Sequence, residues 1–211
     1  MTNVSTTLTA TTEPTEIDAD TDGRTLRRRR NRDAVITSLI ELIDEGDLDP
    51  TVAKIADRAA VSHRSIFRYF DDLDDLARTA IETAVRQSLP MTVIPNLGAG
   101  SLADRIEAMV TSRVHLLKQT SRLLRVAHRK STTVPEIDRG LATTAEMTHD
   151  QLTRHFAAEF DGMEPAIAEQ LSLALSAMMG FGGYDHQSRL LGRIDDEIAD
   201  SWRTTLHRLL G

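Results

Sequence analysis

Apolar residues recur every three or four positions through most of the chain, as they do in amphipathic helices that bury one face. Residues that open helices stand where these patterns begin, notably Ser62 and the pair Asp71 and Asp72. Asp49 and Pro50 give a similar start signal. In the first half, the pattern predicts a helix that begins near Asn31 and further helices over residues 52–59, 63–70 and 73–88.

The second half shows the same periodicity in longer segments. The predicted helices cover residues 101–130, with an interruption near Gln119, and residues 141–160, 165–179 and 194–210. Alternating patterns and hairpin turns are missing, so the predicted fold class is all-α, with about nine helices in total.

The segment from Thr51 to Phe70 is predicted to form two short helices joined by a tight turn. Polar residues gather at the start of its second helix: Ser62, His63, Arg64 and Ser65. A helix-turn-helix presents this part of its second helix to base edges in the DNA major groove. An arginine-rich arm precedes the segment and an aromatic-basic run ends it, which strengthens the assignment.

Residues 30–76 resemble the N-terminal domain of the TetR/AcrR family of bacterial transcriptional regulators. The matching stretch reads TVAKIADRAAVSHRSIFRYFDDLDDL, from Thr51 to Leu76. The resemblance implies a three-helix DNA-binding domain over residues 24–72 and a helical ligand-binding and dimerisation domain over 73–211. It further implies a homodimer paired through the last two helices, about 164–182 and 194–210.

The function implied by this resemblance is a homodimeric repressor, released from a palindromic operator on double-stranded DNA by an unknown small-molecule effector. The alternative is a helical DNA-binding adaptor or architectural protein without an effector. A helical enzyme is disfavoured, because no set of acid, base, nucleophile or metal ligands is apparent. No catalytic residue, metal or cofactor is predicted.

Arg64 is the best candidate for reading a base, because a guanidinium can bond two guanine acceptors, although a phosphate contact is an equal alternative. Phe67 is expected to serve packing rather than a contact with DNA. The arginine arm is expected to supply salt-sensitive affinity without sequence information. The predicted DNA contacts are Arg27, Arg28, Arg29, Arg30, Thr51, Lys54, Ser62, His63, Arg64, Ser65, Arg68 and Tyr69.

Three positions depart from the family pattern. Ala60 replaces the usual glycine of the turn, which requires either a right-handed conformation or some strain. Phe67 stands where a tyrosine is usual, and Leu73 where a lysine is frequent, so two phosphate contacts are missing. Arg68 and the arginine arm can compensate for that loss.

The resemblance also implies a ligand pocket in the helical body. Its candidate lining residues are Leu117, Leu124, Phe156, Met178 and Tyr184, each with ordinary core packing as the alternative. Residues 113–130 form a second basic stretch. It is interpreted either as a solvated face paired with acids or as a site for an anionic ligand or partner.

The distribution of charge agrees with a DNA-binding domain joined to a separate helical body. The net charge is −7, but residues 24–70 carry ten basic side chains against seven acidic ones. Residues 1–23 carry five acids and no base, and are expected to form a disordered acidic tail. The chain contains no cysteine and no long apolar run, which excludes disulfides and thiol sensing. A bacterial cytoplasmic, nucleoid-associated location is expected.

Overall fold

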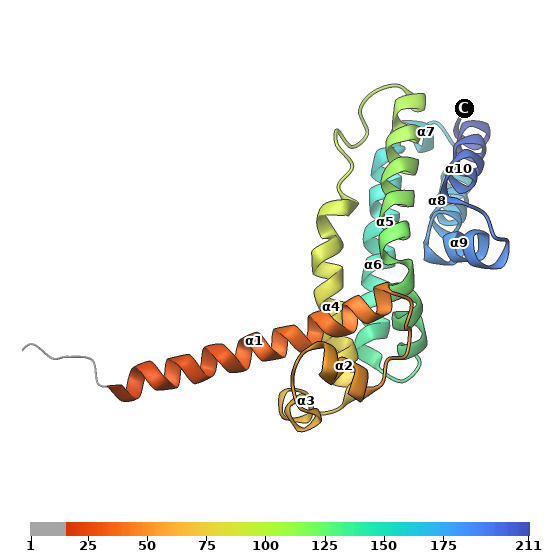
Figure 1. The fold of residues 1–211 in the computed structure, drawn as a ribbon. Helices are drawn as coiled ribbons and strands as arrows, with labels where there is room; N and C mark the ends of the chain where they lie inside the picture. Colours follow the sequence, from red (N-terminus) through yellow and green to blue (C-terminus); the bar gives the residue numbers. More distant parts are fainter. Residues whose placement is uncertain (1–15) are drawn as a thin grey trace, which may run out of the picture.

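The protein is entirely helical in the computed structural model, which describes residues 16–211 and side chains from residue 23 onward. Figure 1 shows a long α1 that projects sideways from an upright bundle. Within residues 16–211 there are ten α-helices and two short irregular helical segments, η1 and η2, and no strand. Their bounds are α1 Glu16–Asp44, α2 Val52–Arg58, α3 His63–Tyr69, α4 Leu73–Ser88, η1 Leu89–Thr92, α5 Leu102–Lys130, α6 Pro135–His155, α7 Ala157–Phe160, α8 Pro165–Met178, α9 Phe181–Asp185, η2 His186–Leu190 and α10 Asp195–Leu210.

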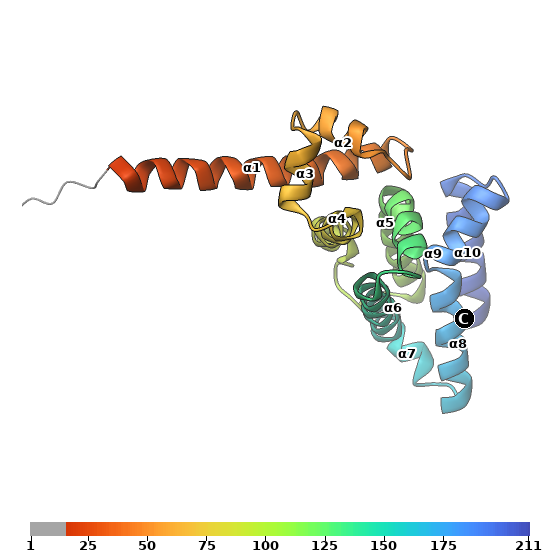
Figure 2. The same cartoon turned by 90° about the horizontal axis from the view of Figure 1, so that it is seen from below.

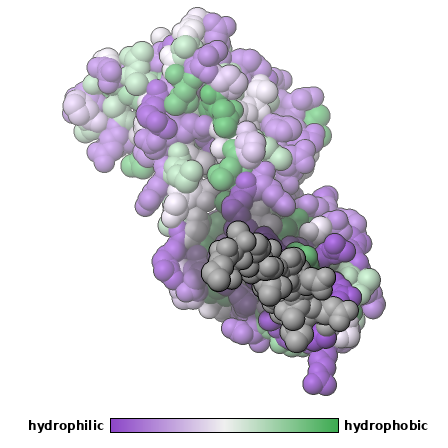
Figure 3. Space-filling view, turned by 90° about the vertical axis from the view of Figure 1, so that its left-hand side faces the viewer, coloured by the Kyte–Doolittle hydropathy of each residue, from purple (hydrophilic) through white to green (hydrophobic). Residues whose placement is uncertain are grey.

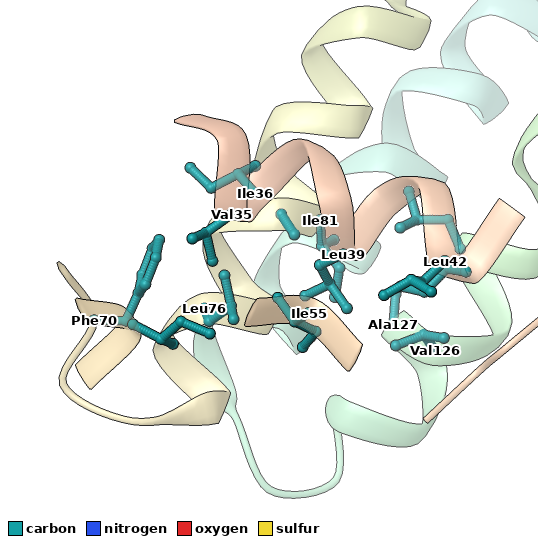
Figure 4. Packing of buried hydrophobic residues seen from close by; sticks show 14 of the residues in the cluster. Val35, Ile36, Leu39, Leu42, Ile55, Phe70, Leu76, Ile81, Val126 and Ala127 are labelled. Carbon is teal, nitrogen blue, oxygen red and sulfur yellow. The ribbon is translucent and has the colours of Figure 1, made fainter. Parts of the chain in front are cut away.

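The first hydrophobic cluster holds together the head, which is formed by α1 to α4. Val35 and Leu39 of α1 pack against Ile55 of α2 and Leu76 of α4 (Figure 4). The cluster also includes Val126 and Ala127 of α5, so the head and the long bundle share one core.

The second hydrophobic cluster fills the bundle formed by α5, α6, α8, α9 and α10. Figure 2, seen from below, places α8, α9 and α10 along the side of the bundle away from α1. Trp202 and Phe156 are completely buried in this cluster. Apolar burial of this kind is the main force that holds the bundle together.

Three predicted boundaries were wrong. The first helix begins at Glu16 rather than near Asn31, because the arginines and Leu26 upstream are strong helix formers and extend an existing helix easily. Residues 16–23 of the predicted disordered tail lie in this helix, and residues 1–15 lie outside the described residues.

The other two corrections concern α5 and α6. The helix α5 continues through the predicted interruption, and the Thr120 hydroxyl donates back to the Leu116 carbonyl inside the helix. The helix α6 begins at Pro135, which suits a first helical position because proline lacks an N–H. None of the helices in residues 16–211 is long and apolar enough to cross a membrane.

Candidate nucleic-acid interface

Side-chain caps define the start of both short helices. The Thr51 hydroxyl accepts a hydrogen bond from the Lys54 backbone N–H at 3.4 Å and opens α2, one residue after the predicted Asp49–Pro50 signal. The Ser62 hydroxyl accepts from the Ser65 N–H at 3.1 Å and opens α3 as predicted. Ser62 and Ser65 also share a hydrogen bond between their hydroxyls, so both side chains are tied to the helix start.

The turn between α2 and α3 closes through two backbone hydrogen bonds. The Val61 N–H donates to the Ala56 carbonyl at 3.0 Å, and the Ala60 N–H donates to the Asp57 carbonyl at 3.2 Å. This is the Schellman arrangement that ends many helices. Ala60 has a φ of 53°, so it adopts the left-handed conformation that favours glycine. The sequence left two alternatives for Ala60, a right-handed conformation or some strain, and the structure shows the strained one.

Replacing Ala60 with glycine is expected to raise the free energy of unfolding by roughly 1 kcal/mol, because glycine adopts a left-handed φ without a Cβ clash. Urea unfolding followed by circular dichroism measures the change. The control is Ala59→Gly, at a residue with a right-handed φ of −76°, where glycine should lower stability. If both variants are destabilised alike, Ala60 carries no backbone strain.

The outward face of α3 consists of His63, Arg64 and Phe67, all exposed. Ile66 and Tyr69 point inward to the first cluster. Phe67 was expected to serve packing rather than a DNA contact, but its side chain is 54% exposed and therefore packs little. His63 and Phe67 are four residues apart and therefore lie on one helix face, opposite the buried one.

Phe67 is thus a candidate contact that sequence reasoning missed. An apolar side chain on a recognition helix can pack against the methyl group of thymine. The helical spacing from His63 and Arg64 was the signal that could have placed it on this face.

Arg68 and Tyr69 form a connected pair at the end of α3. Arg68 donates from Nη2 to the Tyr69 hydroxyl at 3.0 Å, and its guanidinium lies 5.2 Å from the centre of the Tyr69 ring. Burial raises the pKa of the Tyr69 phenol, but hydrogen bonds with Arg68 and Asn31 bring it below its usual value. Tyr69 belongs to the core, and its hydroxyl accepts the hydrogen bond from the exposed Arg68.

The predicted arginine arm is part of α1 rather than a separate strand of chain. Arg27, Arg28, Arg29 and Arg30 are exposed. Figures 1 and 2 agree that the N-terminal part of α1 extends past α3 with no other element beside it. Arg32 lies 4.8 Å above the Phe70 ring at the end of α3, which fixes the base of the arm against α3.

Lys54 lies on the exposed face of α2 and already has an acidic partner. Its ammonium is 2.6 Å from an Asp47 carboxylate oxygen, and this hydrogen bond lowers the pKa of Asp47. A phosphate would have to compete with Asp47 for Lys54, and exposed ion pairs of this kind are weak enough to allow exchange.

The five residues predicted to line a pocket lie together in the second hydrophobic cluster. Leu117, Phe156 and Tyr184 are buried, and Leu124 and Met178 are partly buried. The Tyr184 hydroxyl donates to Asp195 at 2.6 Å, and burial is the first cause that raises the pKa of this phenol. Their role in ligand binding stays a prediction.

Most of the second basic stretch serves as internal connections. Arg122 donates to the carbonyl of Asp44, the last residue of α1, and Arg129 donates to the carbonyl of Leu48 in the loop that follows. These two hydrogen bonds join α5 to the head. The further ion pairs are Lys118 with Asp195, Arg125 with Asp185, and Lys130 with Asp74. Arg113 differs from all of these, because its contacts in the described chain are uncharged. In residues 16–211 no cluster of three acidic or histidine side chains is placed to hold a metal.

Comparisons with known proteins agree with this geometry. Residues 36–80 match the model of a family described as bacterial regulatory proteins, tetR family. No curated protein matches the chain by sequence. A solved transcriptional regulator from Rhodococcus sp. Rha1 is 18% identical, with a TM-score of 0.63 over 87% of this chain and 95% of that one. The multidrug binding protein EbrR, solved with imidazole, is 18% identical, with a TM-score of 0.58 over 87% of this chain and 93% of that one. Both share the fold.

Proposed function

We propose that this chain, whose N-terminal domain is that of the tetR family of bacterial regulatory proteins, is a ligand-responsive transcriptional regulator that represses from a palindromic operator as a homodimer. The observation that carries the proposal is the exposed α3 face of His63, Arg64 and Phe67, together with the exposed arginines of the helix α1, which packs against the end of α3 through Arg32 and Phe70. A recognition helix and a basic arm on one side can contact base edges and phosphates together.

We assign a separate role to each of the two domains. Residues 24–72 would bind DNA, and residues 73–211 would bind the effector and the second subunit. Within the head, Thr51, Ser62 and Tyr69 would contact phosphates, whereas His63, Arg64 and Ser65 would face the bases. Ser65 is half-buried and tied to Ser62, so it can act only through a short contact at the helix start.

The dimer would form mainly through α8. Its buried side chains are only Ser172 and Leu175, although it is the most apolar helix of the chain. Its outward face presents Ile167 and Leu173, which are 57% and 54% exposed, and exposed apolar faces of this kind usually meet a partner. The outward face of α10 is mostly polar, with Leu209 as its exposed apolar residue. The pairing would place two α3 helices on successive turns of DNA.

The effector would bind in the body and favour an arrangement of the two heads that does not fit the operator. EbrR, a multidrug binding protein, shares the fold, which supports a ligand site in this chain as well. An adaptor or architectural protein without an effector is the second candidate, since the predicted pocket residues are packed as ordinary core.

Replacing Arg64 with alanine is expected to cost about 1–3 kcal/mol of binding to the operator, and much less on random DNA, if its guanidinium reads a base. Fluorescence anisotropy with both DNAs at one salt concentration measures the difference. The control is Arg139→Ala, at an exposed α6 residue paired with Glu136, which should leave both affinities unchanged. Equal losses on both DNAs would make Arg64 a phosphate contact.

The whole proposal is tested by a mobility shift of the purified chain on the DNA upstream of its own gene, with random DNA as competitor. Specific, salt-sensitive binding by a dimer is the expected result. Failure to bind any DNA above the random level would overturn it. A thermal-shift screen of small molecules then separates the ligand-responsive regulator from the adaptor, because only the first gains stability with a ligand.

A further inference from the structure

The helix α5 contains two buried arginines with opposite surroundings. Arg105 is 7% exposed and forms an ion pair with Glu159. Arg113, two turns further along, is 6% exposed, and its described partners are neutral: the Gln151 amide oxygen at 3.2 Å, the Thr148 carbonyl at 3.5 Å and the Met109 sulfur at 3.8 Å. Burial lowers the pKa of Arg113 to about 10, so the guanidinium stays charged at neutral pH.

A buried cation without an acidic partner costs much more free energy than a paired one. Such a charge suits a site that an anion occupies, because a carboxylate can accept two hydrogen bonds from the planar fork of a guanidinium. Arg105, on the same helix, shows that the fold supplies a carboxylate, Glu159 of α7, where the charge is purely structural. Of the two buried arginines, Arg113 is therefore the one without an acidic partner in the described chain.

The contacts of Gln151 connect Arg113 to η1, so an anion bound at Arg113 could affect that segment. Its Oε1 accepts from Arg113 Nη2, and its Nε2 donates to the Thr92 carbonyl of η1 at 2.5 Å. The Ser112 hydroxyl, next to Arg113, also donates to the Met91 carbonyl of η1 at 3.4 Å. The segment η1 is thus held to Ser112 and Gln151, the neighbours of Arg113, by neutral hydrogen bonds that an anion could displace.

Exposed apolar side chains lie in and next to η1 and on α6. Leu89, Met91 and Val93 are 43%, 36% and 65% exposed, and Met147, one turn before Gln151 on α6, is 55% exposed. Figure 3 looks onto this side of the molecule and shows hydrophobic residues gathered on the upper body. A ligand that reaches Arg113 here would meet apolar surface around its charged end.

We propose that Arg113 is the anchor for an amphipathic carboxylate, whose charged end displaces Gln151 and whose apolar part packs under η1. The inference rests on the proposed function, since it names the chemical class of effector for the same body. Freed from Gln151, η1 can shift, and it directly continues α4, which packs in the head.

Octanoate is the probe, with octanamide and octylammonium as neutral and cationic controls of equal chain length. Trp202, the chain's one tryptophan, is completely buried in the body and reports binding by its fluorescence. A saturable change with octanoate, at least tenfold weaker with octanamide and octylammonium, is expected. In Arg113→Met, octanoate binding should fall at least tenfold, and Arg113→Lys should retain part of it.

The thermal midpoint without ligand distinguishes a binding role from a structural one. Arg113→Met should unfold at the wild-type temperature or above, because a buried unpaired charge is removed, whereas Arg105→Met should unfold well below it. Equal octanoate binding by wild type and Arg113→Met, or preference for octylammonium, would overturn the inference. Absence of octanoate binding by a chain that still shifts operator DNA would overturn it alone and leave the proposed function standing. Failure to bind DNA would remove the proposed function instead.

Discussion

Replacing Arg27, Arg28, Arg29 and Arg30 with alanine together is expected to weaken DNA binding by about 100-fold at low salt, equally on operator and random DNA. All four side chains are exposed on the part of α1 that extends past α3. Each phosphate contact releases condensed counterions, so the logarithm of the binding constant falls with the logarithm of salt by roughly 0.9 per contact. Losing four contacts should therefore make the salt slope shallower by roughly 3 to 4.

Anisotropy titrations on both DNAs across a salt series measure this effect. Alanine is the best helix former, so α1 should keep its helix and circular dichroism should not change. The matched control replaces four exposed arginines of the body, Arg139, Arg154, Arg193 and Arg208, with alanine, and so removes the same charge. If the two quadruple variants have the same salt slope, the arm acts only through net charge and does not touch DNA.

The second large effect is expected in the body. Arg105 donates to Glu159, and its Nη1 also donates to the Gly100 carbonyl at 2.6 Å. In Glu159→Leu the Arg105 guanidinium stays buried without an acidic partner, which should lower the free energy of unfolding by about 3–5 kcal/mol. Urea unfolding followed by Trp202 fluorescence and by circular dichroism measures the loss.

The companion variant is the double substitution Arg105→Met with Glu159→Leu, which removes both charges at similar volume. The pair is incompletely satisfied, because Arg105 Nε and Glu159 Oε2 have no hydrogen-bond partner among the described residues. The double variant should therefore recover most of the lost stability. If it is no more stable than Glu159→Leu alone, the loss comes from packing around Glu159 and not from an unpaired charge.

Helices and their caps could be predicted from the sequence, because the residues that determine them are neighbours along the chain. The apolar spacing predicted the all-α fold, which was confirmed, and Ser62 was correctly assigned as the cap of α3. The error at Phe67 came from residue type, since packing was favoured for an aromatic side chain although helical spacing places it on the exposed face with His63. The angular positions of the residues around α3 would have corrected this error.

Long-range partners were not predictable in the same way. Arg105 and Arg113 look alike in the sequence, and only folding brings Glu159 to one and Gln151 to the other. The same holds for Arg122 and Arg129, whose carbonyl partners lie 78 and 81 residues away. The pocket, the dimer face and the DNA contacts stay predictions, because each requires a second molecule.

The shared core of Figure 4 limits how this protein can be recombined with others. Val126 and Ala127 of α5 belong to the same cluster as Leu39 and Ile55 of the head. A chimera that exchanges residues 24–72 alone would join two unmatched halves of one core, with a loss of packing in both. New operator specificity is therefore obtained with less damage by exchanging only the solvent-facing residues of α3, and evolutionary change of specificity faces the same restriction.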